Sequence, residues 1–171
     1  MTTGSKCSVT TTVTTWLVLT TIMVLVGYGC SNSNAKADDS QITPECVVGT
    51  YLVFQGSGIK SLWTFTSGGN LIVTSSAQSA VNFSTQHGTW EIAGPEEIRA
   101  TLLDFSFDDQ GDLINIARVD IVVNFTDTGC DEIEGDFSFR FFEADEDPLD
   151  PSTDTGEPLS DTITGWRLTV P

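Results

Sequence analysis

The chain has 171 residues and carries 24 acidic against 7 basic side chains, which gives a formal net charge of −17 at pH 7. So acidic a surface repels the phosphates of nucleic acids and of anionic lipid headgroups. We therefore expect no nucleic-acid partner. The length allows one domain with a single hydrophobic core.

An uncharged apolar run, VTTWLVLTTIMVLVGYGC, occupies residues 13–30 and follows Lys6. A basic residue, an apolar stretch and then a small residue before cysteine form the pattern of a bacterial lipoprotein signal. The run predicts a signal peptide over residues 1–29 and attachment of a lipid, such as palmitate, to Cys30. The alternatives are plain secretion and an uncleaved single-pass anchor, because spanning a bilayer takes roughly 17 to 25 residues.

Beyond this run, residues 30–45 are polar and lack apolar periodicity, which predicts a flexible tether before a folded domain over 46–171. Cleavage would remove Lys6 alone among the charged residues, leaving a formal net charge of −18. Ser31 follows the lipidated cysteine, in place of the Asp that tends to retain lipoproteins in the inner membrane. The resemblance of the signal therefore implies outer-membrane placement in the cell envelope.

The four cysteines have separate expected roles. Cys7 lies in the removed segment and Cys30 takes the lipid, so Cys46 and Cys130 remain in an oxidising compartment. We predict a disulfide between them, closing a loop of about 85 residues that the chain-entropy model values at roughly 4 kcal/mol. We expect no metal site and no cofactor, because these cysteines and the single His87 lack zinc-ligand spacing.

From residue 46 onward, short segments rich in β-branched and aromatic residues alternate with turn residues. This pattern predicts an all-β domain with no amphipathic helix after Cys30. The eight expected strands span 48–55, 60–66, 71–75, 87–93, 97–107, 113–125, 131–144 and 161–170. Eight sequential strands with short connections predict an antiparallel up-and-down barrel, since closure removes exposed edges. A β-sandwich is the alternative.

The alternation of residues along each strand predicts which side chains face the barrel interior. In the segment 113–125 one parity is almost wholly apolar, and the other carries Arg118 and Asp120. We group Arg99 and Asp104, on the neighbouring strand, with these two charges. The uniform apolar face predicts that the charges point outward as cross-strand pairs. The alternative is a polar pocket floor that orients a ligand.

The order of the strands also predicts which loops lie together. Cys46 and Cys130 fall at the same end of an eight-stranded barrel. The turn at 56–58, the loop before His87, the turn at 108–112 and the acidic loop after residue 144 fall at the opposite end. We expect this acidic mouth to face away from the membrane and to be the functional end.

Several segments together resemble a group of small bacterial proteins with lipocalin-like barrels. These segments are GTY at 49–51, TFTSGGN at 64–70, HGTW at 87–90, ATLLDFSFDDQGDLINIARVDIVV at 100–123, EGDFSF at 134–139 and TGWRLTV at 164–170. The resemblance implies a barrel of the lipocalin or allene-oxide-cyclase type. Some proteins of those classes bind small apolar molecules and others are cyclases. No catalytic residue carries over to this chain.

Aromatic side chains supply the candidate ligand pocket of such a barrel, namely Trp63, Phe65, Trp90, Phe137, Phe139 and Phe141. The function we expect is non-enzymatic binding of a small apolar ligand. The alternatives are a cyclase or isomerase that uses the cavity, and a structural or interaction protein of the cell surface.

Two further features have competing interpretations. His87 could act as a general base, or it could simply open a strand in which Gly88 allows close packing and Trp90 fills the core. The acidic run at 145–150 could bind calcium, or it could be a solvated loop.

Overall fold

The computed structural model describes residues 8–9, 28–29 and 41–171. Strand β1 (Ser8–Val9) pairs antiparallel with β2 (Tyr28–Gly29). The rest of the predicted signal peptide, the lipidation site Cys30 and the tether as far as residue 40 lie outside the described residues. Among the helices that are described, none has the length and apolar character needed to cross a membrane.

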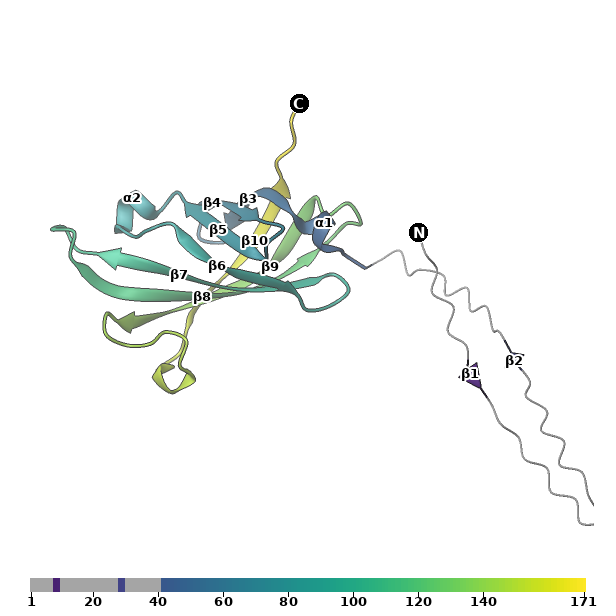
Figure 1. The fold of residues 1–171 in the computed structure, drawn as a ribbon. Coiled ribbons are helices and arrows are strands. Elements are labelled where there is room, and N and C mark those ends of the chain that lie inside the picture. The colour runs from purple at the N-terminus through teal and green to yellow at the C-terminus, as the bar shows by residue number, and fades with distance from the viewer. Residues whose placement is uncertain (1–7, 10–27, 30–40) are drawn as a thin grey trace, which may run out of the picture. The chain divides into compact units, whose positions relative to one another are not determined.

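Residues 41–171 form an all-β unit whose eight strands close into an antiparallel barrel (Figure 1). Each strand pairs with the next along the chain, and the last pairs with the first. The strands are β3 (Gly49–Gln55), β4 (Lys60–Phe65), β5 (Asn70–Ser75), β6 (Gln86–Ile92), β7 (Glu97–Phe107), β8 (Leu113–Phe125), β9 (Glu132–Glu143) and β10 (Leu159–Arg167). The predicted up-and-down barrel is confirmed, and the domain is not a β-sandwich.

Three short helical segments accompany the barrel, although the sequence indicated none. They are α1 (Pro44–Val47), α2 (Gln78–Val81) and the 3-10 turn η1 (Pro151–Thr153). Each is about a single turn, which is too short to show a helical period of apolar residues. Helix α1 lies where the sequence predicted the end of the tether. Ile42 is buried, with only 8% of its surface exposed, and its backbone N–H donates to the Pro95 carbonyl. The packed domain therefore begins before residue 46.

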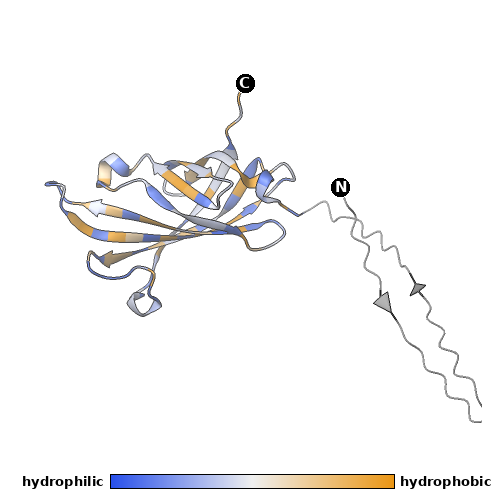
Figure 2. Cartoon of the chain, viewed as in Figure 1, coloured by the Kyte–Doolittle hydropathy of each residue, from blue (hydrophilic) through white to orange (hydrophobic). Residues whose placement is uncertain are grey.

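Hydrophobic and hydrophilic residues alternate along the strands (Figure 2). In β8 the odd-numbered residues from Ala117 to Phe125 are buried, and they face the barrel interior with the even-numbered residues Ile98, Ala100 and Leu102 of β7. This period of two is the alternation expected of a closed sheet with one apolar face. The last strand ends at Arg167 rather than at residue 170, and Val170 is 95% exposed.

One end of the barrel is filled by aromatic side chains. The ring of Tyr51 meets the rings of Phe65 and Phe125 at centroid distances of 5.6 and 6.1 Å. The disulfide between Cys46 and Cys130 lies at the same end, with Cα atoms 5.7 Å apart, and confirms the predicted pairing. This end is therefore closed by a packed core and a covalent bond.

Arg167 completes the closed end. Its guanidinium carbon lies 4.8 Å from the centre of the Tyr51 ring, and its N–H groups donate to the backbone carbonyls of Cys46, Val48 and Cys130. The Tyr51 hydroxyl donates to the Cys130 carbonyl at 2.8 Å. The cation thus supplies charge-assisted hydrogen bonds to carbonyl groups of the α1 region and the β8–β9 loop.

The segment around His87 has the structure expected if His87 simply opens a strand. His87 is exposed on β6, and a Cβ at Gly88 would lie 2.6 Å from the Leu102 Cα atom and overlap the Thr101 carbonyl. Gly88 therefore allows β6 and β7 to approach closely. Trp90 packs against the core cluster, and its indole N–H donates to the Thr66 carbonyl.

Candidate functional site: a cavity in the open half of the barrel

The half of the barrel opposite the disulfide is hollow. It contains a cavity of about 400 Å³. Residues at the rim come from both the strand ends and the loops, including Ile59, Val81 and Leu159. The mouth therefore lies at the end where the β3–β4, β5–β6, β7–β8 and β9–β10 connections gather.

Four of the six aromatic residues predicted for the pocket line this cavity. Trp63 projects from β4, and Phe137, Phe139 and Phe141 project from β9. The three phenylalanines lie directly opposite Ile121, Val119 and Ala117 of β8, which also line the cavity. Phe141 stands at the mouth and is 54% exposed, whereas Trp63 is 2% exposed.

The other two aromatic residues, Phe65 and Trp90, are not lining residues. Their rings pack edge to face at 5.7 Å, and Phe65 also contacts Tyr51 in the filled half. Phe65 has the same inward parity as Trp63, but two residues along a strand shift a side chain by roughly 6.6 Å. That distance along the strand takes Phe65 from the cavity into the closed-end core.

Among the described residues that line the cavity, Asp104 is the one with an ionisable side chain. It projects inward from β7, opposite Ala117 of β8, and is only 4% exposed. Gln86 of β6, another lining residue, donates its side-chain N–H to Asp104 Oδ2 at 2.7 Å. Ser106, two residues further along β7, adds a hydroxyl group to the same wall.

Burial raises the pKa of the Asp104 carboxyl above its usual value, and the hydrogen bond from Gln86 opposes this shift. The burial effect is the larger because an ionised carboxylate loses hydration inside an apolar cavity. A buried carboxyl group with a perturbed pKa in a cavity is the kind of group found at binding and catalytic sites.

Grouping Asp104 with Arg99 and Arg118 was wrong. Arg118 and Asp120 lie on the outer wall, and Arg99 is exposed beside Glu97. Asp104 has the parity of Ile98, Ala100 and Leu102, so it faces inward, whereas Arg99 has the opposite parity. The parity of β7 was visible in the sequence and would have identified Asp104. Gln86 lacked such a signal, because it opens a strand after an irregular loop.

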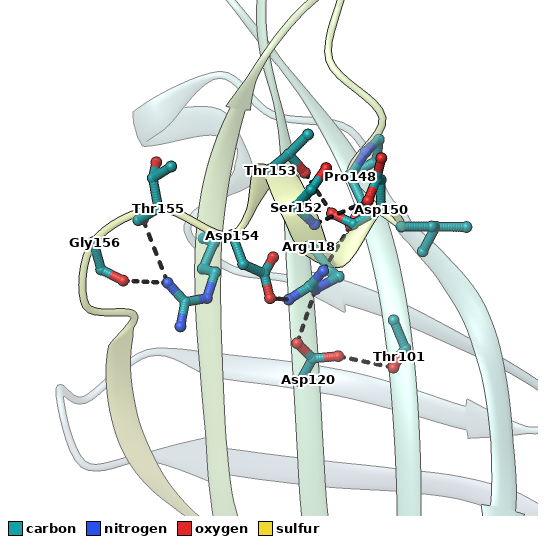
Figure 3. A network of polar contacts seen from close by, with 12 residues as sticks. Thr101, Arg118, Asp120, Pro148, Asp150, Ser152, Thr153, Asp154, Thr155 and Gly156 are labelled. Carbon is teal, nitrogen blue, oxygen red and sulfur yellow. Dashed lines mark hydrogen bonds and ion pairs between the residues drawn. The ribbon is translucent and has the colours of Figure 1, made fainter.

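Arg118 instead anchors the acidic loop to the outer wall (Figure 3). Its guanidinium donates to Asp120 at 2.9 Å, to Asp154 at 2.8 Å and to the Pro148 carbonyl at 2.7 Å. It also lies 5.4 Å from the centre of the Phe142 ring, which is 2% exposed. The loop at 144–158 is thus packed against the barrel through Arg118, which the sequence analysis placed on the outer wall in cross-strand pairs, with a pocket floor as the alternative.

Two carboxylates in the acidic run also accept local backbone hydrogen bonds. Asp147 accepts the backbone N–H of Leu149, and Asp150 accepts that of Ser152. In the part of the chain that the structure describes, no three His, Cys, Asp or Glu side chains are grouped to hold a metal ion. The calcium interpretation of this run therefore gains no support from the geometry.

Replacing the buried carboxyl should change the pH dependence of stability. The pKa of Asp104 is raised on folding, so its contribution is favourable below the pKa of the unfolded chain and is lost as the pH rises through the folded value. Asp104→Asn should therefore raise the free energy of unfolding near pH 7 by ~1 kcal/mol, with a smaller gain at pH 4. Urea unfolding at both pH values measures the effect. An equal or larger gain at pH 4 would contradict this position of the carboxyl.

Comparison with known proteins gave no relative for this site. No protein-family model matches the chain, and neither the curated proteins nor the solved structures that were searched contain a match.

Proposed function

We propose that residues 41–171 form a binding barrel for small, largely apolar molecules. The observation that carries this proposal is the cavity of about 400 Å³ in the open half of the barrel. Ligand pockets in proteins are of order 300–1,000 Å³ and combine apolar walls with a few polar groups. This cavity has that composition, because its lining is mostly aromatic and aliphatic with a few polar side chains, namely Asp104, Gln86, Ser106, Gln55 and Ser75.

The closed barrel provides a framework for such a cavity. All eight strands pair in one ring, and the Cys46–Cys130 disulfide lies at the end opposite the cavity. A preformed site loses little conformational entropy on binding. Each methylene group that a ligand buries there contributes about 0.8 kcal/mol, so a chain of several methylenes is enough for measurable affinity.

Partly filling the cavity should weaken binding. Val119 of β8 is 6% exposed and lines the cavity, whereas Val122 of the same strand is 40% exposed on the outer wall. Val119→Trp should weaken binding of the neutral dye N-phenyl-1-naphthylamine by at least ~10-fold, because the added indole occupies the ligand volume. Val122→Trp should bind the dye like the wild type. Dye fluorescence titration measures both.

Circular dichroism and the thermal midpoint should show that both tryptophan variants are folded. Ala117→Phe, at another lining position, provides a second cavity-filling variant if Val119→Trp does not fold. The proposal fails if the wild type gives no saturable dye signal, or if the inward and outward variants bind the dye equally.

The position of Asp104 also favours a second candidate, an isomerase or cyclase. A carboxyl group within a water-poor cavity can transfer a proton to or from a bound substrate. Binding remains the better-supported function because the described residues that line the cavity place no second ionisable group beside Asp104. Turnover of a bound ligand that Asp104→Asn abolishes would favour the enzyme.

We further propose that the barrel is attached to the cell envelope through a lipid on Cys30, with Ser31 favouring the outer membrane. The support is the sequence pattern at 13–30 together with the disulfide, which is compatible with an extracytoplasmic compartment.

Removing the proposed lipid attachment site should release the protein. Cys30→Ala should lose incorporation of labelled palmitate and leave the membrane fraction, because neither a diacylglyceryl group nor an acyl chain can be attached. Cys7→Ala is the matched control and should behave as the wild type. Cys30→Ala that stays in the membrane fraction would indicate an uncleaved anchor, and wild type without label would indicate plain secretion.

A further inference from the structure

We propose that the ligands of this barrel are apolar amines, held with the cationic nitrogen at Asp104 and the hydrocarbon part among the aromatic side chains. This inference rests on the proposed binding function and names the chemical class of the ligand. It assigns Asp104 and Gln86 as the residues that select it.

The hydrogen bonding of Asp104 leaves room for a ligand. Gln86 donates to Oδ2, whereas Oδ1 accepts no hydrogen bond from any residue that the structure describes. A carboxylate oxygen that takes no donor from the protein can accept a hydrogen bond from a ligand N–H in the cavity. Oδ1 belongs to Asp104, which is 4% exposed and lines the cavity, so a bound ligand can reach this oxygen.

Charge distinguishes an amine from a fatty acid here. Within residues 41–171, the side chains that line the cavity include Asp104 but no Lys, Arg or His. A bound carboxylate would meet no cation and would lie in the same cavity as another acid, which raises the free energy of its charged form. A bound ammonium group would instead form a charge-assisted hydrogen bond, which is roughly twice as strong as a neutral one.

Two other features favour a cation. The aromatic side chains of Trp63, Phe137 and Phe139 line the same cavity, and aromatic rings attract ammonium groups. The chain also carries a formal net charge of −17. A strongly negative protein raises the local concentration of cations and repels anions.

The affinity for an amine should depend on the ionisation of one carboxyl group. The side chains facing Asp104 from the adjoining strands are Gln86 of β6 and Ala117 of β8, and neither is charged or titratable. As the pH falls through the pKa of Asp104, the carboxylate is protonated and the ion pair is lost. Binding of an alcohol of the same chain length should not weaken over that range, because it needs no charge.

The test is displacement of N-phenyl-1-naphthylamine by decylamine, decanol and decanoate, which share one hydrocarbon length. At pH 7 we expect decylamine to bind wild type about tenfold more tightly than decanol, and decanoate to bind most weakly. Asp104→Asn should remove the preference for decylamine while keeping decanol affinity within about twofold. Asp109→Asn, an exposed change of the same charge on the β7–β8 loop, should keep the preference.

The outcomes separate this inference from the proposed function. Decanoate binding as tightly as decylamine, or an unchanged decylamine preference in Asp104→Asn, would overturn the amine assignment while dye and decanol binding still support a ligand barrel. Equal loss of the preference in Asp109→Asn would show that general charge, and not Asp104, selects the amine. Absence of dye and ligand binding in wild type would overturn both proposals.

Discussion

Arg167 closes one end of the barrel by packing on Tyr51 and binding the surrounding carbonyl groups. The division of the barrel into a filled half and a hollow half follows from this closure. A single guanidinium group satisfies the carbonyls of Cys46, Val48 and Cys130 while covering the Tyr51 ring. An eight-stranded barrel has an interior just wide enough for side chains or one small ligand. In this chain the sealed half holds the side chains, which leaves the other half free to be hollow.

Asp104 shows how this division bears on function. A carboxyl group in an apolar interior is unfavourable for folding, and a hydrogen bond from Gln86 compensates for only one of its two oxygens. Such groups are found where proteins bind or react, since stability is commonly lower at functional sites. The disulfide and the aromatic core lie at the other end of the barrel and stabilise the domain that holds this group.

Strand alternation and turn residues made the barrel predictable from the sequence. Parity alone indicated which face of residues 113–125 is buried, and the strand count brought Cys46 and Cys130 to one end. The position of each inward side chain along the barrel axis was not predictable from the sequence. Trp63 and Phe65 have the same parity and similar chemistry, yet only Trp63 lines the cavity, because the neighbours that fill the interior come from distant strands.

The site itself was half predictable. Four of the aromatic lining residues followed from the aromatic pattern, whereas Asp104 was assigned to the outer wall although its parity matches that of Leu102. The fold of the acidic loop was not predictable, because it depends on Arg118 donating at once to Asp120, Asp154 and Pro148. Contacts between residues this far apart in sequence have no local pattern.

A crystal structure of the complex with decylamine tests the central claim most directly. The account predicts the amine nitrogen within about 2.7–3.2 Å of an Asp104 carboxylate oxygen, and the alkyl chain between Val119, Phe137 and Phe139. A ligand bound on the outer wall, or one inside the barrel with its nitrogen away from Asp104, would contradict it.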